Sequence, residues 1–249
     1  MKELILKCAD LVQQSKNTVV LTGAGISTNA GIPDFRGPQG LYTSRLYDAE
    51  KIFDIAYFLK DQKPFYEFAH DFIAIESTIA PTATHHALAT LEARGRIKAI
   101  ITQNIDGLHQ KAGSQKVLNM HGSFLTSHCL RCRKSFDYPE LKAMVLQHVI
   151  PHCSCRGIIK PDIVFFGEDV KYYHQALELA QHADLFFVIG TSCVVYPAAS
   201  LPQFVPGKIV IVNNTKIDLN MYNIALEVQG DIDVFFNGLM EALKDKSNK

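Results

Sequence analysis

Four cysteines in the second half of the sequence have the spacing of metal ligands. They form two close pairs, Cys129-x-x-Cys132 and Cys153-x-Cys155, separated by twenty residues. Two such pairs can present four thiolates tetrahedrally, as a structural zinc ion requires. His152 stands three residues before Cys155 and is an alternative ligand to Cys153, while buried reduced thiols are the structural alternative. A zinc ion held by four sulfurs has no open position for water, so it would stabilise the fold of this segment.

His121 lies eight residues before the first cysteine, in the stretch NMHGSFLTSHCLRC (119–132). If four sulfurs complete the metal site, the metal does not need this histidine. A neutral imidazole with a pKa of about 6.5 is suited to abstract a proton near neutral pH. Taken without further context, however, a histidine before a glycine is more often a structural hydrogen-bonding residue.

A glycine turn follows an apolar stretch near the N-terminus, in the sequence TGAGIS (22–27). It resembles half of a dinucleotide-binding fingerprint, in which glycines let backbone N–H groups approach a pyrophosphate at a helix N-terminus. The full fingerprint would place a third glycine at position 28, where this chain has Thr28. An ordinary strand-to-helix turn is almost as good an explanation.

The elements that would position these residues alternate between strands and helices. Apolar runs predict strands within residues 17–25, 97–104, 161–168, 184–192 and 208–214, and helical periodicity predicts helices at the N-terminus and within 64–79, 82–93, 138–149, 171–183 and 231–243. This alternation indicates an α/β fold with a parallel sheet. Polar residues or glycines follow four of the strands, at Gly23–Gly25, Gln103–Asn104, Thr191–Ser192 and Asn213–Asn214. Open α/β sheets bind ligands at this edge.

The bulk composition is that of a globular protein, with 47% hydrophobic and 20% charged residues. Because the formal net charge is zero, no overall field would attract nucleic acid or an anionic membrane. Charges at Lys2, Glu3 and Lys7 interrupt the N-terminal apolar residues, unlike a signal peptide, and no segment is apolar enough to span a membrane. We therefore expect a cytoplasmic monomer with reduced or metal-bound cysteines.

Several segments occur together in one order and make the interpretation specific. They are GAGISTNAGIPDFRG (23–37), TQNIDGLH (102–109), HG (121–122), the cysteine pairs, IKPDIVFFGE (159–168) and GTSCVVYPAA (190–199). Together they resemble the sirtuin family of NAD-dependent protein-lysine deacylases, and specifically a bacterial-type deacetylase. The resemblance implies a Rossmann-like NAD-binding domain of residues 1–36, 81–122 and 160–249. It also implies a smaller domain of residues 37–80 and 123–159, made of a helical segment and a zinc ribbon.

The resemblance also implies a reaction. In the family, NAD and an acylated lysine enter the cleft between the domains, the acyl oxygen attacks the nicotinamide ribose, and nicotinamide leaves. A histidine then acts as base on a ribose hydroxyl, giving free lysine and 2′-O-acyl-ADP-ribose. Here His121 would be the base, Asn104 would hold the ribose, and Asp106 would hold the carboxamide. The other NAD-binding residues would be Gly23, Ala24, Gly25, Ser27, Asp34, Phe35, Arg36, Gln103, Ile105, Gly190, Thr191, Ser192, Asn213, Asn214, Asp231 and Ile232.

The acylated peptide would lie between the segments IVFFGE (163–168) and CVVYP (193–197). Backbone pairing would provide its affinity, with contacts from Val164, Phe166, Gly167, Glu168 and Val194. Relatives that remove succinyl or malonyl groups carry Tyr-x-x-Arg in the helical part of the small domain. This chain has Tyr66 but Ala69 in place of the arginine, which favours acetyl or longer apolar groups.

Three other functions fit parts of the sequence. A mono-ADP-ribosyltransferase would share the NAD site but would not need His121 together with an acyl tunnel. An NAD-dependent dehydrogenase would need the third glycine and would leave the cysteines unexplained. A zinc-ribbon binding module would not need four sets of polar residues at strand ends. The deacetylase accounts for all of these features.

Overall fold

The computed structural model describes residues 1–34, 48–76, 78–147, 150–219, 221 and 223–247. Its larger sheet has six parallel strands in the order β3-β2-β1-β7-β8-β9. The strands are β1 (Thr18–Thr22), β2 (Ala99–Thr102), β3 (Val117–Asn119), β7 (Leu185–Ile189), β8 (Lys208–Asn213) and β9 (Ile224–Gln229). This topology confirms the predicted α/β fold with a Rossmann-like sheet.

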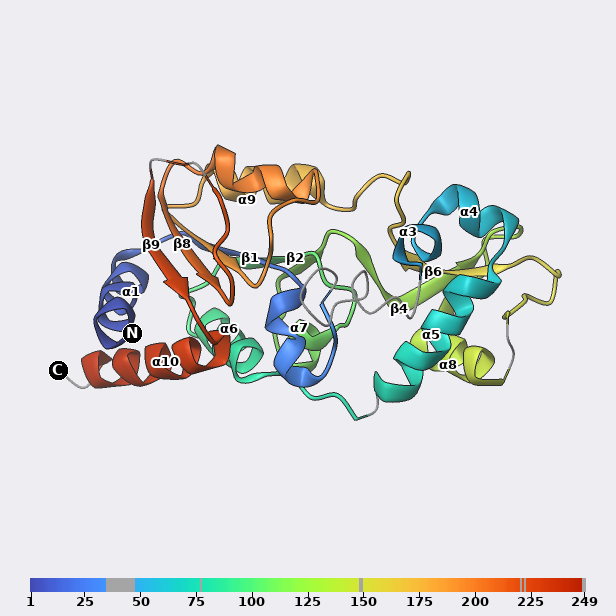
Figure 1. The fold of residues 1–249 in the computed structure, drawn as a ribbon, viewed down its shortest axis with the longest axis horizontal. Helices are drawn as coiled ribbons and strands as arrows, with labels where there is room; N and C mark the ends of the chain where they lie inside the picture. Colours follow the sequence, from blue (N-terminus) through green and yellow to red (C-terminus); the bar gives the residue numbers. More distant parts are fainter. Residues whose placement is uncertain (35–47, 77, 148–149, 220, 222, 248–249) are drawn as a thin grey trace.

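Helices cover both faces of the larger sheet, which is why its central strands are apolar without alternation. Along β1, Val20 packs with α1 (Lys2–Gln14), α6 (Ala83–Ala93) and α10 (Ile232–Ser247). Its neighbours Val19 and Leu21 point to the other face, beneath α9 (Tyr173–Gln181) and the 3-10 helix η3 (Ala198–Phe204). Figure 1 shows α9 on one side of this sheet and α1, α6 and α10 on the other.

A smaller antiparallel sheet lies at the end of the molecule far from both termini (Figure 1). Its strands are β4 (Gly122–Cys129), β5 (Ser135–Asp137) and β6 (Ile159–Ile163), in the order β5-β4-β6. The helices α3 (Ala49–Ile52), α4 (Ile55–Lys60), α5 (Lys63–Glu76) and α8 (Tyr138–Gln147) surround it. Its core is aromatic: Phe165 contacts Phe53, Phe58 and Phe65 with ring centroids 5.0–6.1 Å apart. The predicted domain division at 159/160 falls inside β6, and the division remains a prediction.

The structure differs from the expected elements at several points. The strand expected over 161–168 was assigned to the parallel sheet, but it is β6, which pairs antiparallel with β4 in the smaller sheet. Strand β6 ends at Ile163. There the chain turns: the Glu168 N–H donates to the Phe165 carbonyl at 3.0 Å, and Gly167 has a φ of +93°. The segment after the glycine turn holds two 3-10 turns, η1 (Ala24–Ile26) and η2 (Thr28–Ala30). The short helix α7 (Leu108–Lys111) was not predicted. Within the described residues, no helix is long and apolar enough to cross a membrane.

Candidate active site

A cavity of about 1600 Å³ lies between the two sheets, at the carboxyl ends of the parallel strands. Strand β1 has β2 on one side and β7 on the other, so the strand order reverses beside β1, where ligands bind in open α/β sheets. The cavity is larger than the roughly 300–1,000 Å³ of a typical small-ligand pocket, so it has room for two substrates. The predicted residues that line it are Gly23, Ala24, Gly25, Asp34, Gln103, Asn104, Ile105, His121, Val164, Phe166, Gly167, Glu168, Gly190, Thr191, Ser192, Asn213 and Asn214.

Part of the cavity wall is bare backbone, formed where the turns after β1 and β7 touch. The Gly25 N–H donates to the Gly190 carbonyl at 2.7 Å. A Cβ at Gly190, whose φ is +58°, would lie 2.5 Å from the Ile26 nitrogen, and a Cβ at Gly25 would lie 2.8 Å from the Gly190 Cα. Only glycine permits this approach. The wall fits a pyrophosphate, and Thr28, at the place of the missing third glycine, donates its hydroxyl to the Gly25 carbonyl at 3.0 Å.

A hydrogen-bonded group of three side chains connects the turn after β1 to the turn after β2. The Asn104 amide donates to the Gly23 carbonyl at 3.1 Å and to the Ser27 hydroxyl at 3.3 Å. The Ser27 hydroxyl donates to one oxygen of Asp106 at 2.7 Å, and the Leu108 N–H donates to the other at 2.9 Å. Burial raises the pKa of Asp106, although these hydrogen bonds oppose the effect. Asn104 lines the cavity, whereas Ser27 and Asp106 lie behind its wall.

His121 lies between β3 and β4 and also lines the cavity. Its Nδ1 is 2.9 Å from the carbonyl oxygen of Gln103. Because a carbonyl oxygen can only accept, Nδ1 carries the proton, and Nε2 is the unprotonated nitrogen of the neutral ring. Burial lowers the pKa of His121 below the ordinary 6.5, partly opposed by the bond to Gln103. The imidazole therefore has the protonation state of a base at neutral pH.

The main chain around His121 is fixed against β6. The Val164 N–H donates to the His121 carbonyl at 2.8 Å. The next residue, Gly122, has a φ of +71°, and a Cβ there would lie 1.8 Å from the Asp162 carbonyl oxygen. The pair His-Gly in the sequence thus has a steric reason: the glycine allows β4 and β6 to meet directly beside the histidine.

Several predicted site residues lie away from the cavity or outside the described structure. Phe35 and Arg36 fall outside the described residues. Asp231 caps α10 by accepting the Val234 N–H at 2.9 Å, and Ile232 is buried in the core beneath that helix. Val194 is exposed. None of the last three lines the cavity, so their contacts with substrates remain predictions.

The residues used to argue acyl preference lie in the small aromatic core. The Tyr66 hydroxyl donates to the Ile159 carbonyl, and both Tyr66 and Ala69 are buried away from the cavity. Acyl preference is therefore better argued from the cavity itself: no described residue that lines it is a lysine or an arginine. No buried cation is thus available there, among the described residues, for an acyl carboxylate.

The sequence did not point to several other residues at this site. The aromatic side chains of Phe53, Tyr172 and Tyr173 line the cavity, as does Tyr196, which lies in the predicted peptide segment 193–197 but was not named as a contact. Half or more of Tyr172 and Tyr196 is exposed, and exposed aromatic residues cannot be recognised from spacing alone. Lys160 is almost fully buried behind the segment that follows β6. It lies just before the strand predicted over 161–168, in the stretch IKPDI, so no pattern in the sequence indicated its burial.

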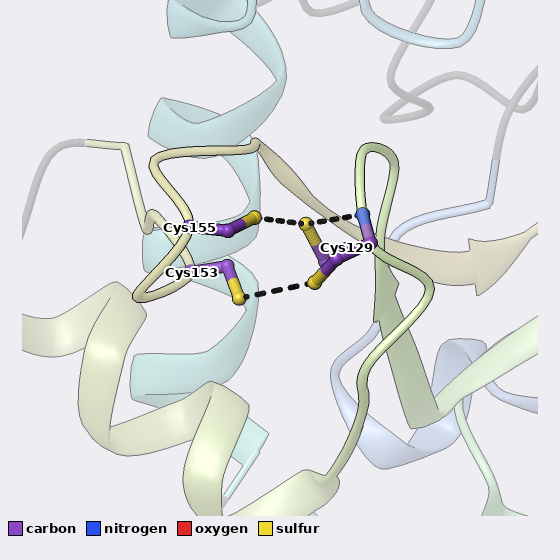
Figure 2. Close-up of side chains that lie close together, drawn as sticks. Cys129, Cys153 and Cys155 are labelled. Atoms are coloured by element: carbon purple, nitrogen blue, oxygen red, sulfur yellow. Dashed lines mark hydrogen bonds between the residues drawn. The ribbon is translucent and has the colours of Figure 1, made fainter.

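The four cysteines lie close together at the end of β4, where Figure 2 shows Cys129, Cys153 and Cys155. Their sulfurs all lie within 4.8 Å of one another, with Cys129 and Cys155 at 3.4 Å and Cys132 and Cys153 at 3.6 Å. Zinc–sulfur bonds of about 2.3 Å in a tetrahedron place sulfurs about 3.8 Å apart. The backbone N–H groups of Arg131 and Cys132 donate to the Cys129 sulfur, which favours a thiolate. The cluster is therefore positioned to bind a structural zinc ion.

His152 is not part of this sulfur cluster. Its side chain is exposed, and its Nδ1 donates to the Ile150 carbonyl at 2.9 Å. Cys153, by contrast, is buried among the other three cysteines. The geometry favours Cys153 over His152 as the fourth ligand.

Comparisons with known proteins agree with this geometry. The sequence model of the Sir2 family matches residues 23–197. The NAD-dependent protein deacetylase of Saccharolobus solfataricus is 45% identical over 218 residues, covering 86% of this chain and 87% of the relative. That of Thermotoga maritima is 44% identical over 219 residues and covers 86% of both chains.

Two solved structures show the same fold with ligands bound. A Sir2 protein with a deacetylated p53 peptide and 3′-O-acetyl-ADP-ribose has a TM-score of 0.88 and 41% identity, covering 94% of this chain and 96% of the other. A Sir2 complex with a p53 peptide and NAD has a TM-score of 0.85 and 38% identity, covering 98% of both chains. The chain described here belongs to the Sir2 family.

Proposed function

We propose that the protein is an NAD-dependent protein-lysine deacetylase, with His121 as its general base. It transfers the acetyl group of acetyl-lysine to ADP-ribose and releases nicotinamide. Family membership supports this activity, as do the relatives named NAD-dependent protein deacetylases and the Sir2 structures with peptide and acetyl-ADP-ribose. Zinc, held by the four cysteines, has a structural role outside the cavity.

The observation that carries the proposal is the 2.9 Å contact between His121 Nδ1 and the Gln103 carbonyl oxygen. The Gln103 carbonyl fixes the proton on Nδ1, so Nε2 is free to take a proton from a ribose hydroxyl. The fixed ring orientation removes the need to reorganise during the reaction. The lowered pKa keeps the ring neutral at the pH of a cell.

The dinucleotide supplies an electrophilic ribose carbon and a leaving nicotinamide. In this proposal, the backbone of Gly23–Gly25 and Gly190 lies against the pyrophosphate, and Thr191 and Ser192 reach the adjoining ribose. Gln103 and Asn104 hold the nicotinamide ribose. Asn213 and Asn214, at the end of β8, bind the adenosine ribose. Asp106 orients the Ser27 hydroxyl, which in turn contacts the Asn104 amide. The contact of Asp106 with the carboxamide remains a prediction.

The peptide lies along the residues that follow β6. Val164, Phe166, Gly167 and Glu168 line the cavity there, and Phe166 is 46% exposed. The N–H groups of Val164, Phe165, Phe166 and Glu168 already donate within the protein. An extended peptide would therefore pair here through Gly167 and the Val164 carbonyl, with little reading of its sequence. The apolar side chains of Val164 and Phe166 provide surface for the methylenes of the lysine and for the acetyl methyl.

Mass spectrometry of an acetyl-lysine peptide incubated with the protein and NAD tests the function. We expect deacetylated peptide, nicotinamide and O-acetyl-ADP-ribose in equal amounts. A peptide that gains ADP-ribose would instead indicate the mono-ADP-ribosyltransferase. Nicotinamide release without peptide deacetylation would indicate NAD hydrolysis and would refute the proposal.

Two finer points belong to the same proposal. We propose that the protein is active as a monomer, and light scattering at working concentration would test this. A cytoplasmic location is proposed from the reduced state that four metal-binding thiols require. Cell fractionation would test it.

A further inference from the structure

The residues after β6 form one continuous wall of the cavity. All six residues from Ile163 to Glu168 line it, and we refer to residues 163–168 as the β6 extension. Three backbone hydrogen bonds tie it to neighbouring segments: Val164 N–H donates to the His121 carbonyl at 2.8 Å, Phe166 N–H donates to the Phe53 carbonyl at 2.6 Å, and Ile55 N–H donates to the Phe166 carbonyl at 3.1 Å. A fourth, from Glu168 N–H to the Phe165 carbonyl at 3.0 Å, closes the turn. None of these four bonds joins Ile163, at the start of the β6 extension, to Glu168, at its end.

A buried lysine occupies the inner side of this turn. The side chain of Lys160 is 4% exposed. Its ammonium group donates to the Ile163 carbonyl at 2.7 Å and to Glu168 Oε2 at 2.9 Å, with the Pro161 carbonyl at 3.4 Å. It also lies 4.2 Å from the centroid of the Phe165 ring. One cation therefore contacts the first, third and last residues of the β6 extension.

Glu168 completes the arrangement from the opposite end. The oxygen that accepts from Lys160 also accepts the Phe165 N–H at 2.8 Å. Two donors thus share one carboxylate oxygen, and the carboxylate holds both the ammonium and the middle of the turn. Glu168 lines the cavity, whereas Lys160 does not. The lysine can influence a bound substrate only through the shape of the β6 extension.

Burying the Lys160 ammonium group in this space is energetically unfavourable compared with burying an apolar side chain. Removing a charge from water has a large penalty, which its partners offset only with good geometry. Burial lowers the pKa of Lys160, and the Glu168 carboxylate opposes this by favouring the ammonium form. A methionine would fill a similar volume and contact Phe165, but it could not join Ile163 to Glu168. The hydrogen bonds of Lys160 therefore restrict the conformation of the turn, which an apolar side chain could not do.

We propose that Lys160 is a positioning residue for the peptide substrate: its ammonium fixes the β6 extension in the shape with which the acetylated peptide pairs. The inference rests on the proposed deacetylase function for the identity of the peptide. It assigns Glu168 a role in holding the turn, in addition to any contact it makes with the peptide.

The test compares Lys160→Met, Lys160→Arg and a matched control. Lys171→Met removes another nearby lysine, whose carboxylate partner, Asp162 at 3.3 Å, lies outside the β6 extension. The direct readout is the Kd of a fluorescein-labelled acetyl-lysine peptide, measured by fluorescence anisotropy without NAD. The KM for NAD, the KM for peptide and the melting temperature are measured in parallel.

We expect Lys160→Met to weaken peptide binding about tenfold or more, which is the effect of losing one or two charge-assisted hydrogen bonds. The KM for NAD should change less than about twofold, and Lys160→Arg should recover most of the binding because it keeps the charge and the donors. Lys171→Met should bind as the unaltered protein does. If Lys160→Met does not fold, Glu168→Gln takes its place, with a weaker but measurable loss of peptide affinity.

The outcomes separate this inference from the proposed function. If the unaltered protein binds the peptide without deacetylating it, and Lys160→Met weakens binding, the positioning role stands and the deacetylase proposal fails. If deacetylation occurs but the variants bind peptide as tightly as the unaltered protein, the positioning role is overturned. An equal rise in the KM for NAD, or no peptide binding by the unaltered protein, overturns it as well.

Discussion

Substitution of Gly122 by alanine tests whether the contact between β4 and β6 positions His121, the proposed general base. The added Cβ would lie 1.8 Å from the Asp162 carbonyl oxygen. Non-bonded carbon and oxygen atoms stay about 3.3 Å apart, so the strands must separate by about 1.5 Å. That movement would break the hydrogen bond between Val164 and the His121 carbonyl and disturb the pairing of Gly122 with Ile163.

The chain offers a matched control at Gly95, in the turn after α6. Its φ of +69° is close to the +71° of Gly122, but a Cβ there meets nothing within 4 Å. Both alanine variants bear the left-handed backbone penalty of about 1–2 kcal/mol. Only Gly122→Ala also loses about two backbone hydrogen bonds, worth about 1 kcal/mol each. Its free energy of unfolding should therefore fall about 2 kcal/mol further than that of Gly95→Ala.

The assays are thermal unfolding and the kcat for deacetylation of an acetyl-lysine peptide at saturating NAD. At about 2–4 °C for each kcal/mol in a chain of this size, Gly122→Ala should melt about 4–8 °C below Gly95→Ala. A shift of the base by about 1 Å lowers kcat about 100-fold, whereas Gly95→Ala should retain its kcat. Equal melting temperatures with full activity in both variants would refute the reasoning.

Three further predictions concern the base, the acyl group and the metal. His121→Ala should lower the rate of deacetylation more than about tenfold. Because burial favours the neutral ring, kcat/KM of the unaltered protein should fall on the acid side with a midpoint below pH 6.5. A midpoint near 7 or above would contradict this. Desuccinylation should be at least about tenfold slower than deacetylation on one peptide, since no described cavity-lining residue is a lysine or arginine, and equal rates would show that the carboxylate finds a cation. Cys153→Ser should lose zinc and much of the small sheet, whereas His152→Ala should keep both. Metal analysis and circular dichroism measure the two effects. Loss of zinc from the histidine variant alone would reverse the ligand assignment.

Four of the six strands of the larger sheet, β1, β2, β7 and β8, could be predicted from the sequence because they carry their signal locally, whereas β3 and β9 were not predicted. Strands β1, β7 and β8 are nearly continuous apolar runs, as a sheet covered on both faces demands. Strand β4 was not recognised because it gives no such signal. Its register against β6 shifts between Ser123 and Ser127, so buried and exposed residues do not alternate. A bulge of this kind depends on the partner strand.

Some residues of the candidate site could likewise be predicted from the local sequence, whereas others depend on tertiary contacts. The glycines near β1 and β7 and the cysteine pairs could be found by spacing, because backbone approach and metal geometry restrict residue type. The role of Lys160 could not be found, since it depends on a turn that brings Ile163 and Glu168 to one ammonium group. Asp231 illustrates a third case, in which a helix cap explains the aspartate without any ligand.

The position of His121 in the chain path has a mechanical consequence. It immediately precedes β4, and only Met120 separates it from β3, so it joins the parallel sheet to the antiparallel one. A second connection between the two sheets, from β6 to α9, is hydrogen-bonded to it, since the Val164 N–H donates to the His121 carbonyl. A rotation of the two halves about these two connections would have its pivot near this residue. Atoms close to a pivot travel least, so the walls of the cleft could open to admit substrates and release products while the imidazole stays almost stationary.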